Sequence, residues 1–191
     1  FQMECAKSGN HLTWGEADEI KKDWRRSNPK ITAWWNKFDK ALKKAVGVNA
    51  KAKAENGHPV PMIYKMESGR VFEWLDPKIN PEDTSRILVT LPNTDPKKGG
   101  PFVEEGTWGG TLFQNVIQAT ARDVLCDMIY RVEQAGYSVR FHVHDELIIE
   151  TPAEHAEKAY EDVLGIMSTP PVWMPKLPVE ATGGIYDQFT K

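Results

Sequence analysis

The sequence is poor in cysteine and has no long apolar run, and each absence excludes a class of protein. Its two cysteines, Cys5 and Cys126, are too few for a disulfide framework or a zinc site. No apolar stretch approaches the length that spans a membrane, and the start, "FQMECAKSG", lacks the pattern of a signal peptide. We therefore expect a soluble, cytoplasmic protein without membrane contact, in which Cys126 belongs to the core.

The chain also lacks an overall excess of positive charge, but its charges are unevenly distributed. Lys and Arg total 24 against 27 Asp and Glu, a net charge of -3. Residues 1–60 hold 12 basic and 7 acidic side chains, whereas residues 101–191 hold 6 and 14. A basic segment joined to an acidic one indicates that the first meets an anionic partner and that the second concentrates carboxylates for metal ions.

Two helices are predicted in the basic N-terminal segment. Thr13 followed by Glu16 is a capping-box signature, and Asn28-Pro29 supplies an N-cap and a first-turn proline for the second helix. Apolar residues recur at helical spacing over residues 31–46, and Gly47 is expected to end the helix. The basic residues on the polar faces are either a solvated surface or a nucleic-acid contact, and the residues alone leave both open.

The middle of the chain contains a predicted hairpin and a long predicted helix. "PVPMIYKMESGRVFEWLDP" indicates a hairpin that bends at Ser68-Gly69-Arg70, followed by an irregular stretch to about Gly110. The helix covers Thr111 to Ala135 and carries an apolar stripe. Another face carries a polar ridge, Asn115, Gln118 and Arg122. Such side chains suit minor-groove base edges and a phosphate, although an ordinary solvated face is the alternative.

A second hairpin is predicted in "SVRFHVHDELIIETP", residues 138–152, because each arm alternates apolar and polar residues. The bend falls near His144-Asp145, where tight hairpins normally have glycine. Asp145 and Glu146 at this bend are close enough to share a divalent cation of the Mg²⁺ type, and a solvated polar turn is the alternative. An amphipathic helix over residues 153–167 and a final strand over residues 177–181 are expected to follow.

Four segments in this order resemble the C-terminal part of a family A DNA polymerase, the bacterial DNA polymerase I type, and most closely its phage-encoded branch. "HVHDELIIE" is similar to the family's third palm motif, and "QNVIQATARDVL" to the helix before it. "ESGRVFEW" is similar to its glycine-arginine hairpin, and "DWRRSNPKITAWW" to the helices that follow the nucleotide-binding helix of the fingers. The resemblance covers nearly the whole chain.

The resemblance implies a role for each predicted site residue. Asp145 would be a ligand of the two active-site Mg²⁺ ions, with Glu146 as a supporting carboxylate, for an in-line phosphoryl displacement that adds dNTPs to a primer. His144 would lie near the primer terminus. Gln118 would contact the minor groove at the new base pair, and Asn115 and Arg122 would lie beside it. Arg70 would touch the DNA backbone of the primer-template.

The resemblance also implies missing parts. The family's first metal-binding aspartate and the helix that binds the incoming nucleotide have no counterpart here, and the chain begins with Phe1 rather than Met. We therefore expect a piece of a longer DNA-directed DNA polymerase, inactive alone, that works with an upstream segment or a separate chain.

The expected fold is α+β, with a helical fingers remnant over residues 1–56 and an antiparallel palm sheet with flanking helices over residues 57–191. Two other functions stay open from the residues alone. A metal-dependent nuclease could use the same carboxylates, and a non-catalytic DNA-binding or assembly module could use the basic helices.

Overall fold

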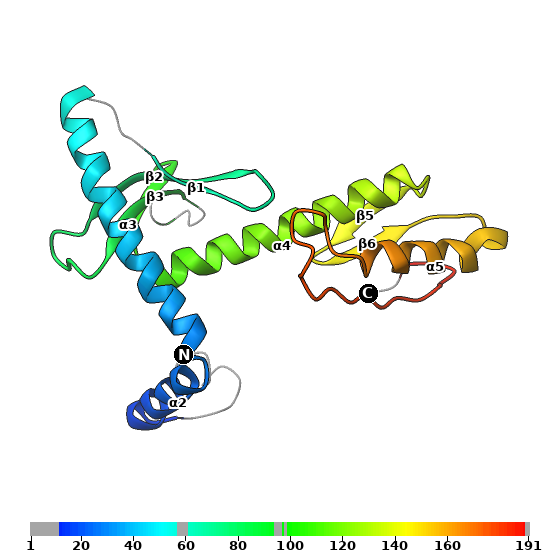
Figure 1. Ribbon diagram of the computed structural model, residues 1–191, viewed down its shortest axis with the longest axis horizontal. Coiled ribbons are helices and arrows are strands. Elements are labelled where there is room, and N and C mark those ends of the chain that lie inside the picture. The colour runs from blue at the N-terminus through cyan, green and yellow to red at the C-terminus, as the bar shows by residue number, and fades with distance from the viewer. Residues whose placement is uncertain (1–11, 57–60, 94–96, 98, 190–191) are drawn as a thin grey trace. The chain divides into compact units, whose positions relative to one another are not determined.

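The computed structural model describes residues 12–56, 61–93, 97 and 99–189 of the chain, so that Cys5 lies outside the described residues (Figure 1). The elements, in chain order, are α2 (Trp14–Ser27), α3 (Pro29–Asn56), β1 (Met62–Lys65), β2 (Val71–Ile79), β3 (Ile87–Pro92), β4 (Phe102–Thr107), α4 (Gly109–Gln134), β5 (Val139–Val143), β6 (Glu146–Ile149), a 3-10 turn η2 (Ala153–His155) and α5 (Ala156–Met167). The predicted α+β class, an antiparallel sheet with flanking helices, is confirmed. Within the described part of the chain, no helix is both long and apolar enough to cross a membrane.

The chain divides into two compact units. Unit 1 comprises Phe1–Met62 and Glu73–Gln114, and unit 2 comprises Ile63–Phe72 and Asn115–Lys191. The chain therefore passes from unit 1 to unit 2 and back at the β1–β2 hairpin, and α4 begins in unit 1 and continues into unit 2. The predicted division into fingers remnant and palm at residue 56 stays a prediction.

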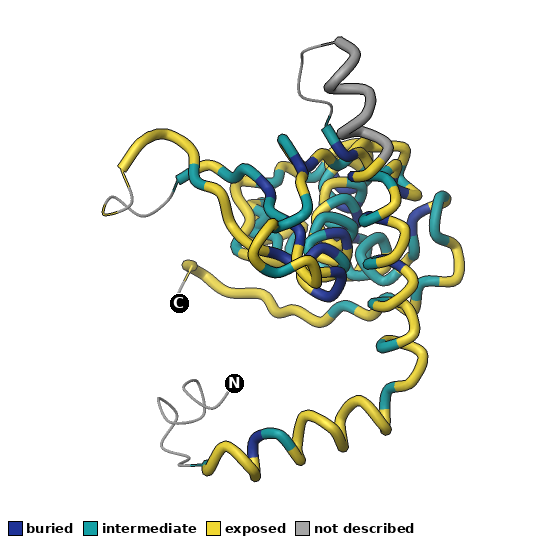
Figure 2. Tube along the Cα trace, turned by 90° about the vertical axis from the view of Figure 1, so that its left-hand side faces the viewer, coloured by how far each residue is buried: buried dark blue, intermediate teal, exposed yellow. Residues whose placement is uncertain are grey.

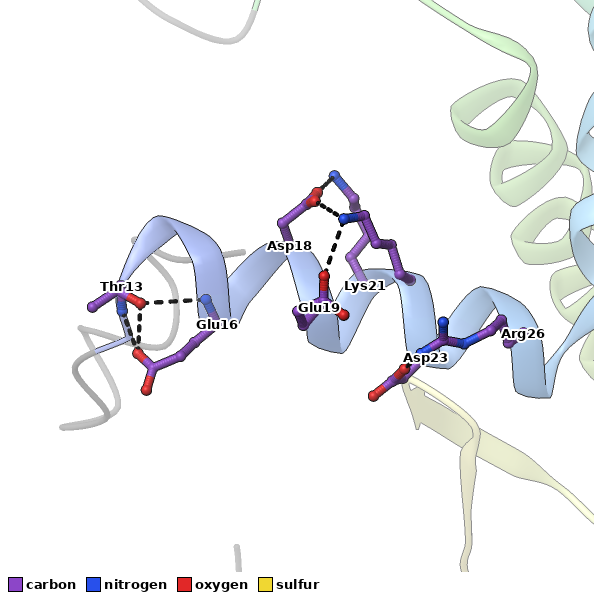
Figure 3. Close-up of polar contacts among 8 residues, drawn as sticks. Thr13, Glu16, Asp18, Glu19, Lys21, Asp23 and Arg26 are labelled. Atoms are coloured by element: carbon purple, nitrogen blue, oxygen red, sulfur yellow. Dashed lines mark hydrogen bonds and ion pairs between the residues drawn. The ribbon is translucent and has the colours of Figure 1, made fainter.

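Helix α2 begins with the predicted capping box. The Glu16 carboxylate accepts the Thr13 backbone N–H at 2.8 Å, and the Thr13 hydroxyl accepts the Glu16 N–H at 3.3 Å (Figure 3). Further along, hydrogen bonds from Lys21 and Lys22 lower the pKa of the Asp18 carboxyl to about 2. Most of α2 is exposed, as the yellow tube in Figure 2 shows. Local capping and ion pairs, rather than burial, therefore support this helix.

Helix α3 is longer than predicted, because Gly47 does not end it and the helix continues to Asn56. A glycine inside a helix costs only about 1 kcal/mol relative to alanine, and the alanine-rich sequence that follows, "NAKAKAEN", has high helix propensity. The expected stop at Gly47 was therefore wrong. Asn28 lies between the two helices, where its side-chain amide donates to the Trp24 carbonyl at 2.8 Å.

The core of unit 1 combines aromatic rings with aliphatic side chains. Phe38 of α3 packs edge-on against Trp74 of β2 and Phe113 of α4, with ring centroids 6.4 and 5.9 Å apart. Gly109 is required where α4 meets α3, because a Cβ there would lie 2.5 Å from the Asp39 Cβ. The Gly109 backbone N–H donates to the Asp39 carboxylate at 2.9 Å. The glycines of "TWGGTL" therefore serve close packing.

The four-stranded sheet has the order β1-β2-β3-β4, with β2–β3 and β3–β4 paired antiparallel. Strand β2 contains a bulge between Leu75 and Lys78, where Asp76 has φ +41° and precedes Pro77. The expectation of an irregular stretch to Gly110 was wrong, because β3 and β4 lie within it. The buried Ile87 and Val89 face the core from β3 and give this strand its alternating burial.

The core of unit 2 is aliphatic and lies along α4 and α5. Buried residues of this core are Val116, Val124, Met128 and Val132 of α4 and Ala159 and Val163 of α5. Helix α4 ends as predicted at Gly136, which has φ +91° and is followed by a hydrogen bond from the Tyr137 N–H to the Val132 carbonyl at 3.2 Å. Cys126 is exposed, so the expectation that it belongs to the core was wrong. Residues 177–181 form no strand either.

Candidate active site

The predicted acidic bend is the turn between β5 and β6 of unit 2. The pair Val143–Glu146 closes the hairpin, which leaves His144 and Asp145 as its two turn residues. His144 has φ +54°, a left-handed conformation that costs a residue other than glycine on the order of 1 kcal/mol. The predicted hairpin is confirmed, and its apex is formed without glycine.

The base of this hairpin is fixed to the helices of unit 2. The Val139 backbone N–H donates to the Glu133 carboxylate of α4 at 2.6 Å, and the Phe141 ring packs edge-on against Phe189 at 5.1 Å. The Tyr137 hydroxyl donates to Asp162 of α5. In Figure 1, β5 and β6 run between the second half of α4 and α5. The apex is therefore carried by strands that are anchored at their far ends.

The charges around that anchor shift its pKa values. Hydrogen bonds from Lys158 and then Tyr137 lower the pKa of the Asp162 carboxyl. The hydrogen bond that Tyr137 donates to Asp162 raises the pKa of the phenol in turn. Lys158 lies 2.5 Å from Asp162, and its own pKa is raised by the same carboxylate. The network therefore keeps an ionised acid next to a neutral phenol at neutral pH.

At the apex itself, His144, Asp145 and Glu146 are exposed. None of the three side chains forms a hydrogen bond or ion pair with another described residue. Two such carboxylates offer the oxygen ligands that Mg²⁺ prefers, and Mg²⁺ sites often use one or two carboxylates together with water and substrate phosphates. No group of three or more His, Cys, Asp or Glu residues is arranged for a metal within the described ranges. The apex therefore fits a Mg²⁺ ion as a partial set of ligands.

The predicted polar ridge lies on the part of α4 that belongs to unit 2. Gln118 and Arg122 are exposed and Asn115 is half-buried. Their spacing places them on one side of the helix, away from the buried Val116 and Val124. Among the described residues, none of the three ridge side chains has a hydrogen-bond or ion-pair partner. The ridge therefore presents donors and acceptors to solvent.

Arg70 is placed beside α4 by the turn of the β1–β2 hairpin. Gly69 has φ +88°, and the Met66 N–H donates to the Arg70 carbonyl at 2.8 Å, as in a three-residue hairpin loop. Arg70 Nε donates to Asp123 Oδ1 at 2.7 Å, and Arg70 Nη2 donates to the Ala119 carbonyl at 3.1 Å. Asp123 was not predicted as a site residue, since no periodicity or motif in the sequence marks a carboxylate that binds a distant turn.

All the predicted site residues belong to unit 2, because residues 63–72 and 115–191 form that unit. The structure thus brings the glycine-arginine turn, the polar ridge and the acidic apex into one compact body, from segments far apart in the sequence. The contacts of these residues with metal, DNA or nucleotide stay predictions.

The chain is similar along its whole length to a known protein. It is 31% identical over 199 aligned residues to a DNA polymerase of Bacillus phage SP02, an alignment that covers 100% of this chain and 30% of the phage protein. The chain is a relative of phage DNA polymerases. It is also 35% identical over 70 residues to a DNA polymerase of Mycobacterium phage D29 and 41% identical over 46 residues to that of Mycobacterium phage L5.

These matches cover different shares of the proteins compared. The D29 alignment takes in 36% of this chain and 11% of the phage protein, and the L5 alignment takes in 23% and 8%. The chain thus spans about a third or less of the length of each curated relative. No family model matches the chain, and no solved structure matches it significantly.

Proposed function

We propose that this chain is the C-terminal part of a family A DNA-directed DNA polymerase, which adds dNTPs to the 3′ end of a primer. The observation that carries the proposal is the full-length similarity to a phage DNA polymerase. Two exposed carboxylates at the apex of an anchored hairpin, in the same unit as the polar ridge, support it. Because the chain covers only 30% of that relative, polymerase activity is proposed for the assembled enzyme.

In this proposal, Asp145 and Glu146 hold Mg²⁺ at the active site, where the metal supplies positive charge against the phosphates of the nucleotide. The left-handed turn at His144 presents both carboxylates at the end of rigid strands, and His144 itself lies near the primer terminus. Gln118 tests the minor groove of the new base pair, where all Watson–Crick pairs offer acceptors at similar places.

The proposed activity also requires a second part of the polymerase. The apex supplies two adjacent carboxylates, and the described residues supply no third ligand to form a cluster with them. An upstream polymerase segment, in the same chain or in a separate one, would contribute the other catalytic aspartate and the dNTP-binding helix. The 191-residue chain by itself is then inactive or nearly so.

Primer extension with Mg²⁺ and dNTPs tests this proposal. The isolated chain should extend no primer, and the upstream polypeptide should restore extension. Asp145→Ala should abolish the restored activity, whereas Glu154→Ala, an exposed acid on η2, should leave it unchanged. Substantial synthesis by the isolated chain would refute the dependence, and normal synthesis by Asp145→Ala would refute the role of the apex.

The same preparation separates the two other functions. A metal-dependent nuclease would cleave DNA in Mg²⁺ without any dNTP, and that cleavage would require Asp145. A non-catalytic binding module would bind DNA in a salt-sensitive way that is indifferent to Asp145. Either result would replace the polymerase proposal.

A further inference from the structure

The carboxylate of Asp123 is fully engaged by a turn that lies more than fifty residues away in the sequence. Its Oδ2 accepts the Ser68 hydroxyl at 2.5 Å, and its Oδ1 accepts Arg70 Nε at 2.7 Å. The Asp123 side chain is only 10% exposed, whereas that of Arg70 is 44% exposed. Asp123 on α4 therefore binds the turn of the β1–β2 hairpin through a carboxylate that is largely shielded from solvent.

The same contacts orient the Arg70 guanidinium. Its Nε–H donates to Asp123 and one Nη2–H donates to the Ala119 carbonyl, so two of the five N–H groups are used by α4. The other three N–H groups form no hydrogen bond with a described residue, and the side chain as a whole is 44% exposed. Ala119 and Asp123 are one helical turn apart, and each directly follows a residue of the polar ridge, Gln118 or Arg122. Arg70 is thus held along the edge of that ridge.

We propose that Asp123 is a positioning residue that fixes Arg70 beside the polar ridge, so that the free edge of the guanidinium binds a backbone phosphate of the primer-template. This inference rests on the proposed polymerase function. The planar fork of arginine suits it, because one edge can bind the protein while the other binds phosphate. A lysine ammonium has no such pair of edges.

Positioning and simple charge predict opposite results when Asp123 loses its charge. Asp123→Asn removes a negative charge close to the DNA, so charge alone predicts tighter binding. Positioning predicts weaker binding, because Arg70 is no longer held in place although it is still present. The two explanations can therefore be separated by the sign of one measured change.

The experiment measures the affinity of the assembled polymerase for primer-template DNA over a range of salt concentrations. We expect Asp123→Asn to weaken binding and to reduce the slope of log K against log salt by about 0.9, the contribution of one phosphate contact, and Arg70→Ala to do the same. The double variant Asp123→Asn with Arg70→Ala should bind DNA no more weakly than Arg70→Ala alone. Arg70→Lys should not restore the salt slope of the wild type. Tighter binding with an unchanged slope in Asp123→Asn would overturn the inference.

Controls distinguish positioning from a general loss of structure and from failure of the proposed function. Asp127→Asn removes an equivalent acid that pairs with Arg131 on the same helix at 2.8 Å, and its salt slope should match that of the wild type. In NMR experiments, the Arg70 Nε–H proton should exchange slowly with solvent in the wild type and rapidly in Asp123→Asn, with or without DNA. If the wild type binds and extends primers but Asp123→Asn behaves identically, only the inference about Asp123 fails. If the wild type binds no DNA, both this inference and the proposed polymerase function fail.

Discussion

The two hairpin turns of unit 2 differ in length, in residues and in surroundings. The turn of the β1–β2 hairpin has Gly69 at φ +88°, and its neighbours Ser68 and Arg70 are bound to α4 through Asp123. The turn of the β5–β6 hairpin has His144 at φ +54°, and Asp145 beside it has no partner among the described residues. One turn is relaxed and fixed by its side chains, whereas the other is strained and leaves its side chains available.

We expect the glycine turn to contribute to stability and the acidic turn to contribute to function. A glycine turn bound by three hydrogen bonds to a helix contributes to the unfolding free energy, because each bond is made in the folded state alone. A strained turn with unpaired carboxylates does the reverse, which is typical of sites that bind a ligand. We therefore expect substitutions at the two turns to affect different measurements.

The largest expected effect is on catalysis, at the acidic turn. Asp145→Asn should lower primer extension by the assembled polymerase by about a hundredfold or more, because a metal ligand contributes several kcal/mol to the transition state. The unfolding free energy of the chain should change by less than about 0.5 kcal/mol, since the side chain is exposed. Urea denaturation together with the extension assay checks both parts. If Asp145→Asn lowered the unfolding free energy by more than it raised the activation free energy of extension, the distinction between the two turns would be lost.

The next effect is on stability, at the glycine turn. Gly69→Ala should destabilise the chain by about 1 kcal/mol, because its φ disfavours any Cβ even though no atom lies within 4 Å of one. Gly165→Ala on α5 is the matched control, where the added Cβ also meets nothing and should stabilise the helix by about 0.5–1 kcal/mol. Equal effects in the two variants would show that the turn is not held in this conformation.

How far the sequence predicts this structure is shown best by α4 and the two hairpins. The apolar stripe and Gly136 predict α4 within two residues at each end, and period-two alternation predicts the arms of the β5–β6 hairpin. Strands β3 and β4 were missed because Pro, Gly and Lys residues between them mask two short strand patterns. The extension of α3 was missed because a single glycine is a weak stop signal.

The candidate site was likewise predicted only in part from the sequence. The apex acids and the ridge are local patterns, so the sequence places them on a turn and on one helix face. Asp123 was missed because its partners, Ser68 and Arg70, are distant in the chain, and only the tertiary structure brings them together.

A comparable effect on stability is expected when the strain at His144 is changed. His144→Gly should leave the unfolding free energy within about 0.5 kcal/mol of the wild type, since relief of the left-handed φ is offset by the greater freedom of glycine in the unfolded chain. His144→Val should destabilise by about 1–2 kcal/mol, because β-branched residues tolerate this φ poorly. Thermal denaturation compares the two variants. If valine were as stable as glycine there, the turn would not be strained.

The smallest effect concerns the anchor of the acidic hairpin. Because the pKa of Asp162 is lowered in the folded chain, ionised Asp162 stabilises the fold above its unfolded value near 3.8, and this contribution is lost as the pH falls through the folded pKa. The difference in stability between the wild type and Asp162→Asn should therefore be largest near neutral pH and shrink below about pH 4. Denaturation at pH 7 and pH 3 measures this difference; one that grows at low pH would contradict the pairing with Lys158.

In the proposed function, the acidic turn, and not the glycine turn, binds the metal ions of nucleotide addition. Paramagnetic broadening by Mn²⁺ tests it directly in the assembled polymerase bound to primer-template and a non-hydrolysable dNTP. Mn²⁺ should broaden the backbone amide signals of His144, Asp145 and Glu146 and spare those of Gly69 and Arg70, and the broadening should be lost in Asp145→Asn. Sharp signals at the acidic turn in this complex, from a polymerase that extends primers when given Mn²⁺ and ordinary dNTPs, would refute the proposed metal site.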